Sequence, residues 1–143
     1  MTSLKRLLEE KARPIISVSP EDTVVHALGL MAQHDIGVVL VLAGEELVGI
    51  FSERDFARKM IPSSQPVSKT LVKEIMSEKV LYVTLSQTVQ ECMALMTEYR
   101  VRHLPVLDED QHVLGILSIG DMVKETISEQ AFLIQQLEHY ITG

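Results

Sequence analysis

The sequence predicts an α/β fold of the mixed α+β kind, in which two similar β-α-β-β-α repeats are flanked by a helix at each end. Three observations support this prediction. The segment from Val18 to Asp55 aligns with the segment from Val83 to Asp121. Within each copy, apolar residues recur first at helical and then at strand spacing. The 143 residues, 46% of them hydrophobic, are enough for an ordinary buried core.

The internal repeat has a shift of 65 residues, which becomes 66 after one gap near Gly44. The matches run in order along the whole unit, so the repeat is one structural element copied twice. Identical residues occupy the aligned positions Val18/Val83, Thr23/Thr88, Val24/Val89, Leu30/Leu95, Met31/Met96, Val41/Val106, Leu42/Leu107, Gly49/Gly115, Ile50/Ile116, Ser52/Ser118 and Asp55/Asp121.

Each copy opens with a β-branched run, over Pro14–Val18 or Val80–Val83, followed by a helix-start signal. That signal is Ser19-Pro20-Glu21-Asp22 in the first copy and Ser86 in the second. The next residues follow the i, i+3, i+4, i+7 pattern of a helix with one buried face. The apolar positions are Val24, Ala27, Leu28 and Met31, and Val89, Cys92, Met93 and Met96.

Two β-rich runs then predict a hairpin in each copy, and a second helix begins near Glu53 or Ile119. The hairpin runs are Val38–Leu42 with Leu47–Phe51, and Leu104–Leu107 with Val113–Leu117. The C-terminal helix has an apolar series that we expect to cover a core edge or a second subunit. The predicted organisation is an N-terminal helix over 1–12, a first repeat over 13–61, a linker with a short helix over 62–76, a second repeat over 77–124, and a C-terminal helix over 125–143.

Composition argues against several classes of function. The formal net charge of −7 disfavours nucleic acid as a partner. The longest apolar stretch is too short to cross a membrane and no secretory signal opens the chain, so we expect a cytoplasmic protein. Cys92 is the only cysteine and is expected to be packed in the core. Neither a nucleophile with its base nor histidines at metal-ligand spacing emerge, which predicts no enzyme activity and no metal.

The most specific motif ends each copy: Gly, two apolar residues, Ser, two variable residues and Asp, at a strand-to-helix junction. It reads Gly49 to Asp55 in the first copy and Gly115 to Asp121 in the second. A serine beside free backbone N–H groups suits a phosphate, and the aspartate can accept hydrogen bonds from a ribose diol. The alternative is that these residues only stabilise the structure. Ser52 and Ser118 would then cap the helices, and the negative charges of Asp55 and Asp121 would stabilise the positive end of each helix dipole.

In these features the sequence resembles the CBS family, whose repeats have this element order and end in this motif. The resemblance covers about Pro14 to about Val123 and includes the stretch from Tyr99 to Val106. It implies two repeats packed by their sheets as a pseudo-twofold pair, often dimerised, with adenosine ligands in the clefts. It also implies that Asp55 and Asp121 hold ribose hydroxyls, that Ser52 and Ser118 lie at phosphate or ribose, and that apolar strand residues sandwich adenine.

The basic residues distinguish the two copies, since Arg102 and His103 align with Gly37 and Val38. Members of the family place basic side chains at this position against phosphates. Arg54, which aligns with Gly120, is expected to join Arg102 and His103 across the repeats, although all three are also compatible with solvent-exposed positions. One phosphate-bearing site is therefore expected. Candidates for the adenine pocket are Ile16, Ser17, Val18, Val38, Tyr82 and Pro105.

The sequence thus predicts a regulatory module that binds AMP, ADP or ATP and signals to an effector protein in trans, as a homodimer. Two alternatives stay open. One is a binder of NAD(H) or S-adenosylmethionine in the same cleft, without hydride transfer because the Rossmann glycine pattern is absent. The other is a structural homodimeric interaction protein whose nucleotide site is vestigial.

Overall fold

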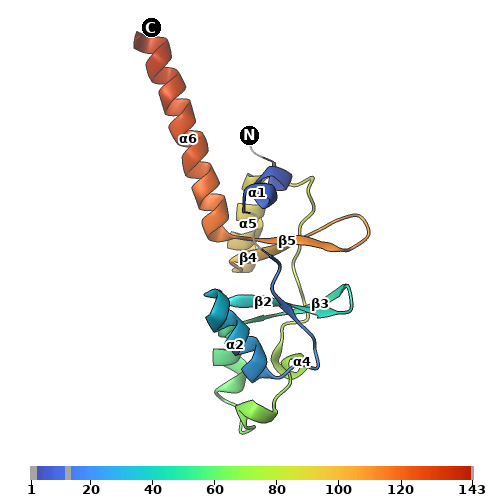
Figure 1. Ribbon diagram of the computed structural model, residues 1–143. Coiled ribbons are helices and arrows are strands. Elements are labelled where there is room, and N and C mark those ends of the chain that lie inside the picture. Colours follow the sequence, from blue (N-terminus) through green and yellow to red (C-terminus); the bar gives the residue numbers. More distant parts are fainter. Residues whose placement is uncertain (1–2, 12–13, 143) are drawn as a thin grey trace. The chain divides into compact units, whose positions relative to one another are not determined.

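The computed structural model describes residues 3–11 and 14–142, with side chains up to residue 140. The chain divides into two compact units. The first-repeat unit comprises Pro14–Leu81 and Glu109–Val113, and the second-repeat unit comprises the N-terminal helix, Tyr82–Asp108 and the chain from Leu114 onward. The elements (Figure 1) are α1 (Leu4–Lys11), β1 (Ser17–Val18), α2 (Val24–His34), β2 (Val38–Ala43), β3 (Glu46–Ser52), α3 (Glu53–Asp55), the π-helix η1 (Phe56–Met60), the 3-10 helix η2 (Val67–Lys69), α4 (Val72–Ile75), α5 (Val89–Tyr99), β4 (His103–Leu107), β5 (Val113–Ser118) and α6 (Ile119–Thr142).

The first-repeat unit is built on a sheet with the strand order β1-β2-β3. β1 is parallel to β2, and β2 forms the expected antiparallel hairpin with β3, with an irregularity between Val41 and Leu42. The segment after α4 adds to the edge, because Ile50 and Ser77 exchange backbone hydrogen bonds. The core joins this sheet to the apolar face of α2 and includes Val24, Ala27, Met31, Val39, Val41 and Phe51.

The second-repeat unit contains the paired strands β4 and β5, with α5 in contact with α6. The predicted strand over Val80–Val83 is not formed as such; only Val83 makes an isolated parallel bridge, to Val106. α1 belongs to this unit and supplies the buried side chains of Leu4 and Leu7. Cys92 is fully buried, which confirms the expected packed thiol, and burial chiefly, with help from nearby Glu91, raises the pKa of that thiol.

The caps of the two long repeat helices differ from the sequence expectation. Thr23 caps α2 by accepting a hydrogen bond from the backbone N–H of His26, and Thr88 caps α5 by accepting one from Glu91, each at 3.1 Å. The predicted signals at Ser19 to Asp22 and at Ser86 therefore precede the true caps. Both helices end in a left-handed residue that is not glycine, Asp35 in one and Arg100 in the other.

Helix α6 has a buried residue near its start and is exposed over its outer part. Met122, near its start, is completely buried, and the hydroxyl of Thr126 donates to the Met122 carbonyl. All described side chains from 131 to 140 are exposed, so this part of the helix covers no core edge within its unit. Figure 1 shows the helix running on past α5 and α1 of the same unit. Over the residues described, none of the helices is long and apolar enough to cross a membrane.

Candidate functional site

The two Gly-to-Asp motifs form the same local structure in the two units. Ser52 precedes α3 and Ser118 precedes α6. The hydroxyl of each accepts a hydrogen bond from the backbone N–H of the aspartate three residues later, at 3.1 Å. The aspartates return this bond, since Asp55 accepts the Ser52 N–H at 3.0 Å and Asp121 accepts the Ser118 N–H at 2.8 Å. The capping role is thus present in both copies, and it fixes both carboxylates at the strand-helix junction.

Asp55 has further partners in the first-repeat unit and is itself buried. Its Oδ1 atom accepts a hydrogen bond from the hydroxyl of Ser77 at 2.8 Å and lies 3.4 Å from the Lys59 ammonium. Its Oδ2 atom also accepts from the Ser52 hydroxyl at 3.0 Å. Ser77, in the segment after α4, therefore helps to hold this carboxylate in place.

Asp121 is held instead by α1. The Lys11 ammonium donates to Asp121 Oδ2 and to the carbonyl of Ile116, both at 2.8 Å, and this ion pair is largely buried. Burial acts to raise the pKa of Asp121, but the hydrogen bonds from Lys11 and Ser118, with the charge of Lys11, outweigh it and hold the pKa below its usual value. Asp121 is thus an anion whose charge is neutralised by a lysine 110 residues earlier.

Arg102 and His103, at the start of β4, are joined to the strand-helix junction of the second-repeat unit. The Arg102 carbonyl accepts the backbone N–H of Ile119 at 2.8 Å, which joins the start of β4 to the start of α6. Burial is the main cause that lowers the pKa of His103, Lys11 is the next, and Arg102 lowers it further, against the opposing effect of Asp121. His103 is therefore a neutral hydrogen-bonding group at pH 7. The side chain of Arg102 is exposed.

The first-repeat unit repeats this backbone arrangement without the basic side chains. The Gly37 carbonyl accepts the N–H of Glu53 at 3.0 Å, which is the counterpart of the bond between Arg102 and Ile119. This bond confirms that Arg102 and Gly37 are equivalent positions. Arg54 is exposed on α3 of the first-repeat unit, so its approach to Arg102 and His103 in the other unit stays a prediction.

The apolar candidates for the adenine pocket also divide between the units. Ser17 and Val18 form β1 and pair with β2, next to the Ile16 carbonyl, which accepts the N–H of Leu40 at 3.4 Å. Val18 and Val38 are buried. In the other unit Pro105 is buried and its carbonyl accepts the N–H of Val83, while Tyr82 is exposed. Of these candidates, Val38 lies next to a motif residue, since it pairs with Ser52 across the hairpin.

The motif glycines are explained by close neighbours within the protein. A Cβ atom at Gly49 would lie 2.6 Å from Met76 Sδ and 3.1 Å from the Ser77 carbonyl oxygen. One at Gly115 would lie 2.7 Å from Leu8 Cδ2. The absence of a side chain thus lets the post-α4 segment approach β3 in one unit and α1 approach β5 in the other.

Two residues at these sites were not predicted from the sequence, Lys11 and Ser77. Both lie outside the repeated segment that carries the motif, and they are not equivalent to each other. No local pattern marks them, because each reaches its aspartate only through the packing of a distant element. The alignment of the two repeats therefore does not identify them.

This chain is similar to proteins and solved structures that contain CBS domains. The CBS domain family model matches residues 9–62 and 72–128. The mitochondrial CBS domain-containing protein CBSX3 of Arabidopsis thaliana is 41% identical over 128 residues, which are 86% of this chain and 62% of that protein. The chain thus spans less than two thirds of that relative. A crystal structure described as a CBS domain has a TM-score of 0.85 and 51% identity, and the match covers 89% of this chain and 99% of that one.

More distant solved structures share the fold and contain ligands. A CBS domain protein from Pyrobaculum aerophilum complexed with AMP has a TM-score of 0.74 at 22% identity, covering 84% of this chain and 89% of that one. A CBS domain pair in complex with 5′-methylthioadenosine and S-adenosyl-L-methionine has a TM-score of 0.77 at 22% identity, covering 90% of this chain and 98% of that one. At this level of identity the likeness establishes the fold alone.

Proposed function

The chain belongs to the CBS-domain family, and on this premise we propose that it is a non-catalytic regulatory module that binds an adenine nucleotide of the AMP, ADP or ATP class between its two repeats. Its output passes to an effector protein in trans. The observation that carries the proposal is the fixed Ser-Asp pair at the strand-helix junction of both repeats. Carboxylates held in this way are suitable acceptors for the hydroxyls of a ribose.

The polar groups around Asp121 support a phosphate site in the second-repeat unit. Arg102 offers a guanidinium, neutral His103 offers a ring N–H, and the Lys11 ammonium is close by. The equivalent positions in the first repeat are Gly37 and Val38, which offer no charge. One phosphate-bearing ligand, with its adenine against the apolar residues named above, fits this asymmetry better than two equal ligands.

Two alternatives remain, a different adenosyl ligand and a structural role without any ligand. A fold relative binds S-adenosyl-L-methionine, which has no phosphate and would use the same ribose acceptors without requiring Arg102. NAD(H) would use these acceptors as well and would place its pyrophosphate near Arg102. The second alternative is a structural homodimer without ligand. It is favoured by the partners that each aspartate already has within the protein, which explain the motif through stability alone.

The test is ligand-dependent thermal stability of the purified, ligand-free chain with AMP, ADP, ATP, NAD, NADH and S-adenosylmethionine. We expect a selective rise in Tm with AMP, ADP or ATP, and its loss in the double variant Asp55→Ala/Asp121→Ala. A rise with NAD, NADH or S-adenosylmethionine alone would favour the first alternative. The matched control is Glu9→Ala/Glu98→Ala, which removes two carboxylates from exposed positions on α1 and α5. No rise for wild type with any of the six ligands would favour the structural homodimer.

A further inference from the structure

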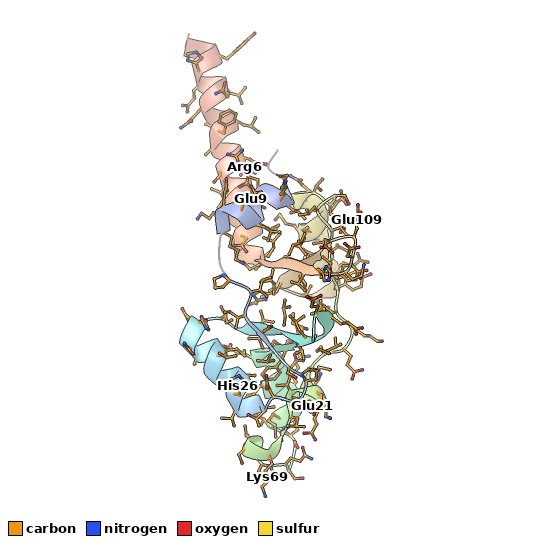
Figure 2. All side chains as sticks on the ribbon, turned by 45° about the vertical axis from the view of Figure 1, so that its right-hand side comes forward. Arg6, Glu9, Glu21, His26, Lys69 and Glu109 are labelled. Carbon is orange, nitrogen blue, oxygen red and sulfur yellow. The ribbon has the colours of Figure 1, made fainter. Side chains whose placement is uncertain are left out.

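The outer part of α6 presents an apolar surface that no described part of the chain covers. Figure 2 shows its side chains standing clear of the other elements of the second-repeat unit. Each of the large apolar residues Ile127, Phe132, Leu133, Ile134, Leu137 and Tyr140 is more than half exposed. A helical extension of this length is marginal in water when it buries nothing, so its stability requires a partner surface.

The spacing on this surface is that of a coiled-coil seam. Ile127, Gln130, Ile134 and Leu137 follow one another at intervals of three, four and three residues, which places them at successive a and d positions. The opposite side of the helix is polar except for Phe132, and it includes Ser128, Gln135, Gln136 and His139. A narrow seam of this kind fits another helix with the same repeat.

We propose that this seam pairs with the seam of a second copy of the chain, as an antiparallel two-helix coiled coil. In this register Ile127 of one copy faces Leu137 of the second copy, and Gln130 faces Ile134. The small side chain of Ala131, beside the seam, then lies opposite itself at the twofold axis. The interface is isologous, so every contact is made twice.

Charge selects the antiparallel direction. With the seam in this register, the flanking position of Lys124 lies opposite Glu138 of the second copy, which gives two oppositely charged pairs per dimer. Both side chains are exposed in the chain itself. A parallel pair would instead place Glu138 beside Leu133 and leave Lys124 next to Ile119, with no complementary charge. The direction of pairing therefore follows from residues outside the seam.

The mass of the full chain in solution tests the interface. Sedimentation or light scattering should give a dimer for wild type and a monomer for Ile134→Lys/Leu137→Lys. The matched control Gln135→Lys/Gln136→Lys adds the same charge on the opposite side of the helix and should remain dimeric. A wild-type monomer, or a dimer that survives Ile134→Lys/Leu137→Lys, overturns the proposal. AMP binding by a wild-type monomer would refute this interface and leave the proposed function intact. Since the variants keep the Ser-Asp motifs, AMP binding by the monomeric Ile134→Lys/Leu137→Lys variant would show that the two proposals are independent.

The direction is tested by disulfides and by charge exchange. In a Cys92→Ala background, an equal mixture of Ile127→Cys and Leu137→Cys chains should oxidise to the mixed 127 to 137 disulfide, identified by mass spectrometry. Predominant 127 to 127 and 137 to 137 products would show a parallel pair and overturn the proposed direction. Lys124→Glu or Glu138→Lys alone should weaken the dimer about five-fold, and the double exchange should restore it.

Discussion

Single side chains determine how each aspartate of the motif is held, and Lys11 has the most distant effect. It is tied to Asp121 and Ile116 although it lies in the N-terminal helix. In the first-repeat unit the hydroxyl of Ser77 has the corresponding place beside Asp55. The two motifs thus have the same local geometry but different neighbours. Asp121 has an ammonium group at 2.8 Å, whereas Asp55 has a serine hydroxyl at 2.8 Å and an ammonium group at 3.4 Å.

Removing Lys11 should reduce stability in a pH-dependent way. The pKa of Asp121 is lowered in the folded protein, so its stabilisation is present above the unfolded-state pKa and is lost as the pH falls through the folded-state value. We expect Lys11→Met to lower the free energy of unfolding by about 1–2 kcal/mol at pH 7. The difference from wild type should shrink on acidification towards that folded-state value, as measured by urea unfolding.

The control for this experiment is Lys5→Met, which removes the same charge from an exposed position on the same helix. Its effect should be small at every pH, because surface charges contribute little. An equal loss in both variants would mean that α1 is weakened as a helix, and that the bond to Asp121 contributes nothing of its own.

The sequence pattern alone was sufficient to identify the motif. It did not identify the residues that hydrogen-bond to the motif aspartates. Ser52, Asp55, Ser118 and Asp121 stand out because they recur at equivalent places in a repeat, and the structure shows the predicted strand-helix junctions. Lys11 and Ser77 have no such recurrence, since they arrive by tertiary packing. The meeting of Arg54 with Arg102 and His103 stays a prediction for a related reason, because it depends on how two separate units are placed.

At the level of elements, the caps of α2 and α5 show how local chemistry fixes a helix start. Thr23 and Thr88 are identical residues at equivalent places, and each satisfies one N–H group of the first turn. The helical spacing of apolar residues was enough to predict both helices. Their exact starts were missed, because Ser, Asp and Pro upstream also favour turns that precede a helix.

Thr88→Ala should destabilise the protein by about 1 kcal/mol, because the N–H of Glu91 loses its acceptor. The matched control is Thr97→Ala, the same change in the last turn of the same helix. The stability of both variants is measured by chemical unfolding. The Thr97 hydroxyl donates to the Met93 carbonyl, a bond that the helix does not need. The Thr97 variant should therefore be neutral or slightly more stable, and equal losses would exclude Thr88 as the cap.

The strand expected over Val80–Val83 shows the limit of periodicity at this scale. Only Val83 pairs, with Val106, while the equivalent β1 pairs at two residues. Strand pairing depends on the position of the partner strand, which the local sequence does not specify. The outer half of α6 is similar, since its amphipathic pattern indicates a partner without naming it.

On the scale of the whole molecule, the buried thiol of Cys92 can report whether a ligand acts on one unit or both. Cys92 lies in the second-repeat unit and its counterpart Ala27, equally buried, lies in the first. Thiol labelling then requires opening of the unit that contains the cysteine. The variant Ala27→Cys/Cys92→Ala moves the probe to the other unit.

If the proposed nucleotide binds both repeats, saturating AMP should slow labelling at both probes, by up to about 100-fold at 100 times Kd. The thiol reagent must be dilute enough that each unit recloses faster than the exposed cysteine reacts, so that the labelling rate reports the opening equilibrium. Protection at Cys92 alone would confine the ligand to the second-repeat unit and disprove a bridging role. The Tm of the relocated-thiol variant, measured without ligand, controls for any disturbance of the core around position 27.

The assignment of α1 to the second-repeat unit has a consequence for the order in which the chain is made. The first-repeat unit is nearly continuous along the sequence and can collapse while translation is still in progress. The helix carrying Leu4 and Leu7 is synthesised before the first-repeat unit, whereas the strands and helices of its own unit are synthesised after it. While the first-repeat unit is being made, the nascent chain therefore exposes the apolar face of α1, to which a chaperone can bind.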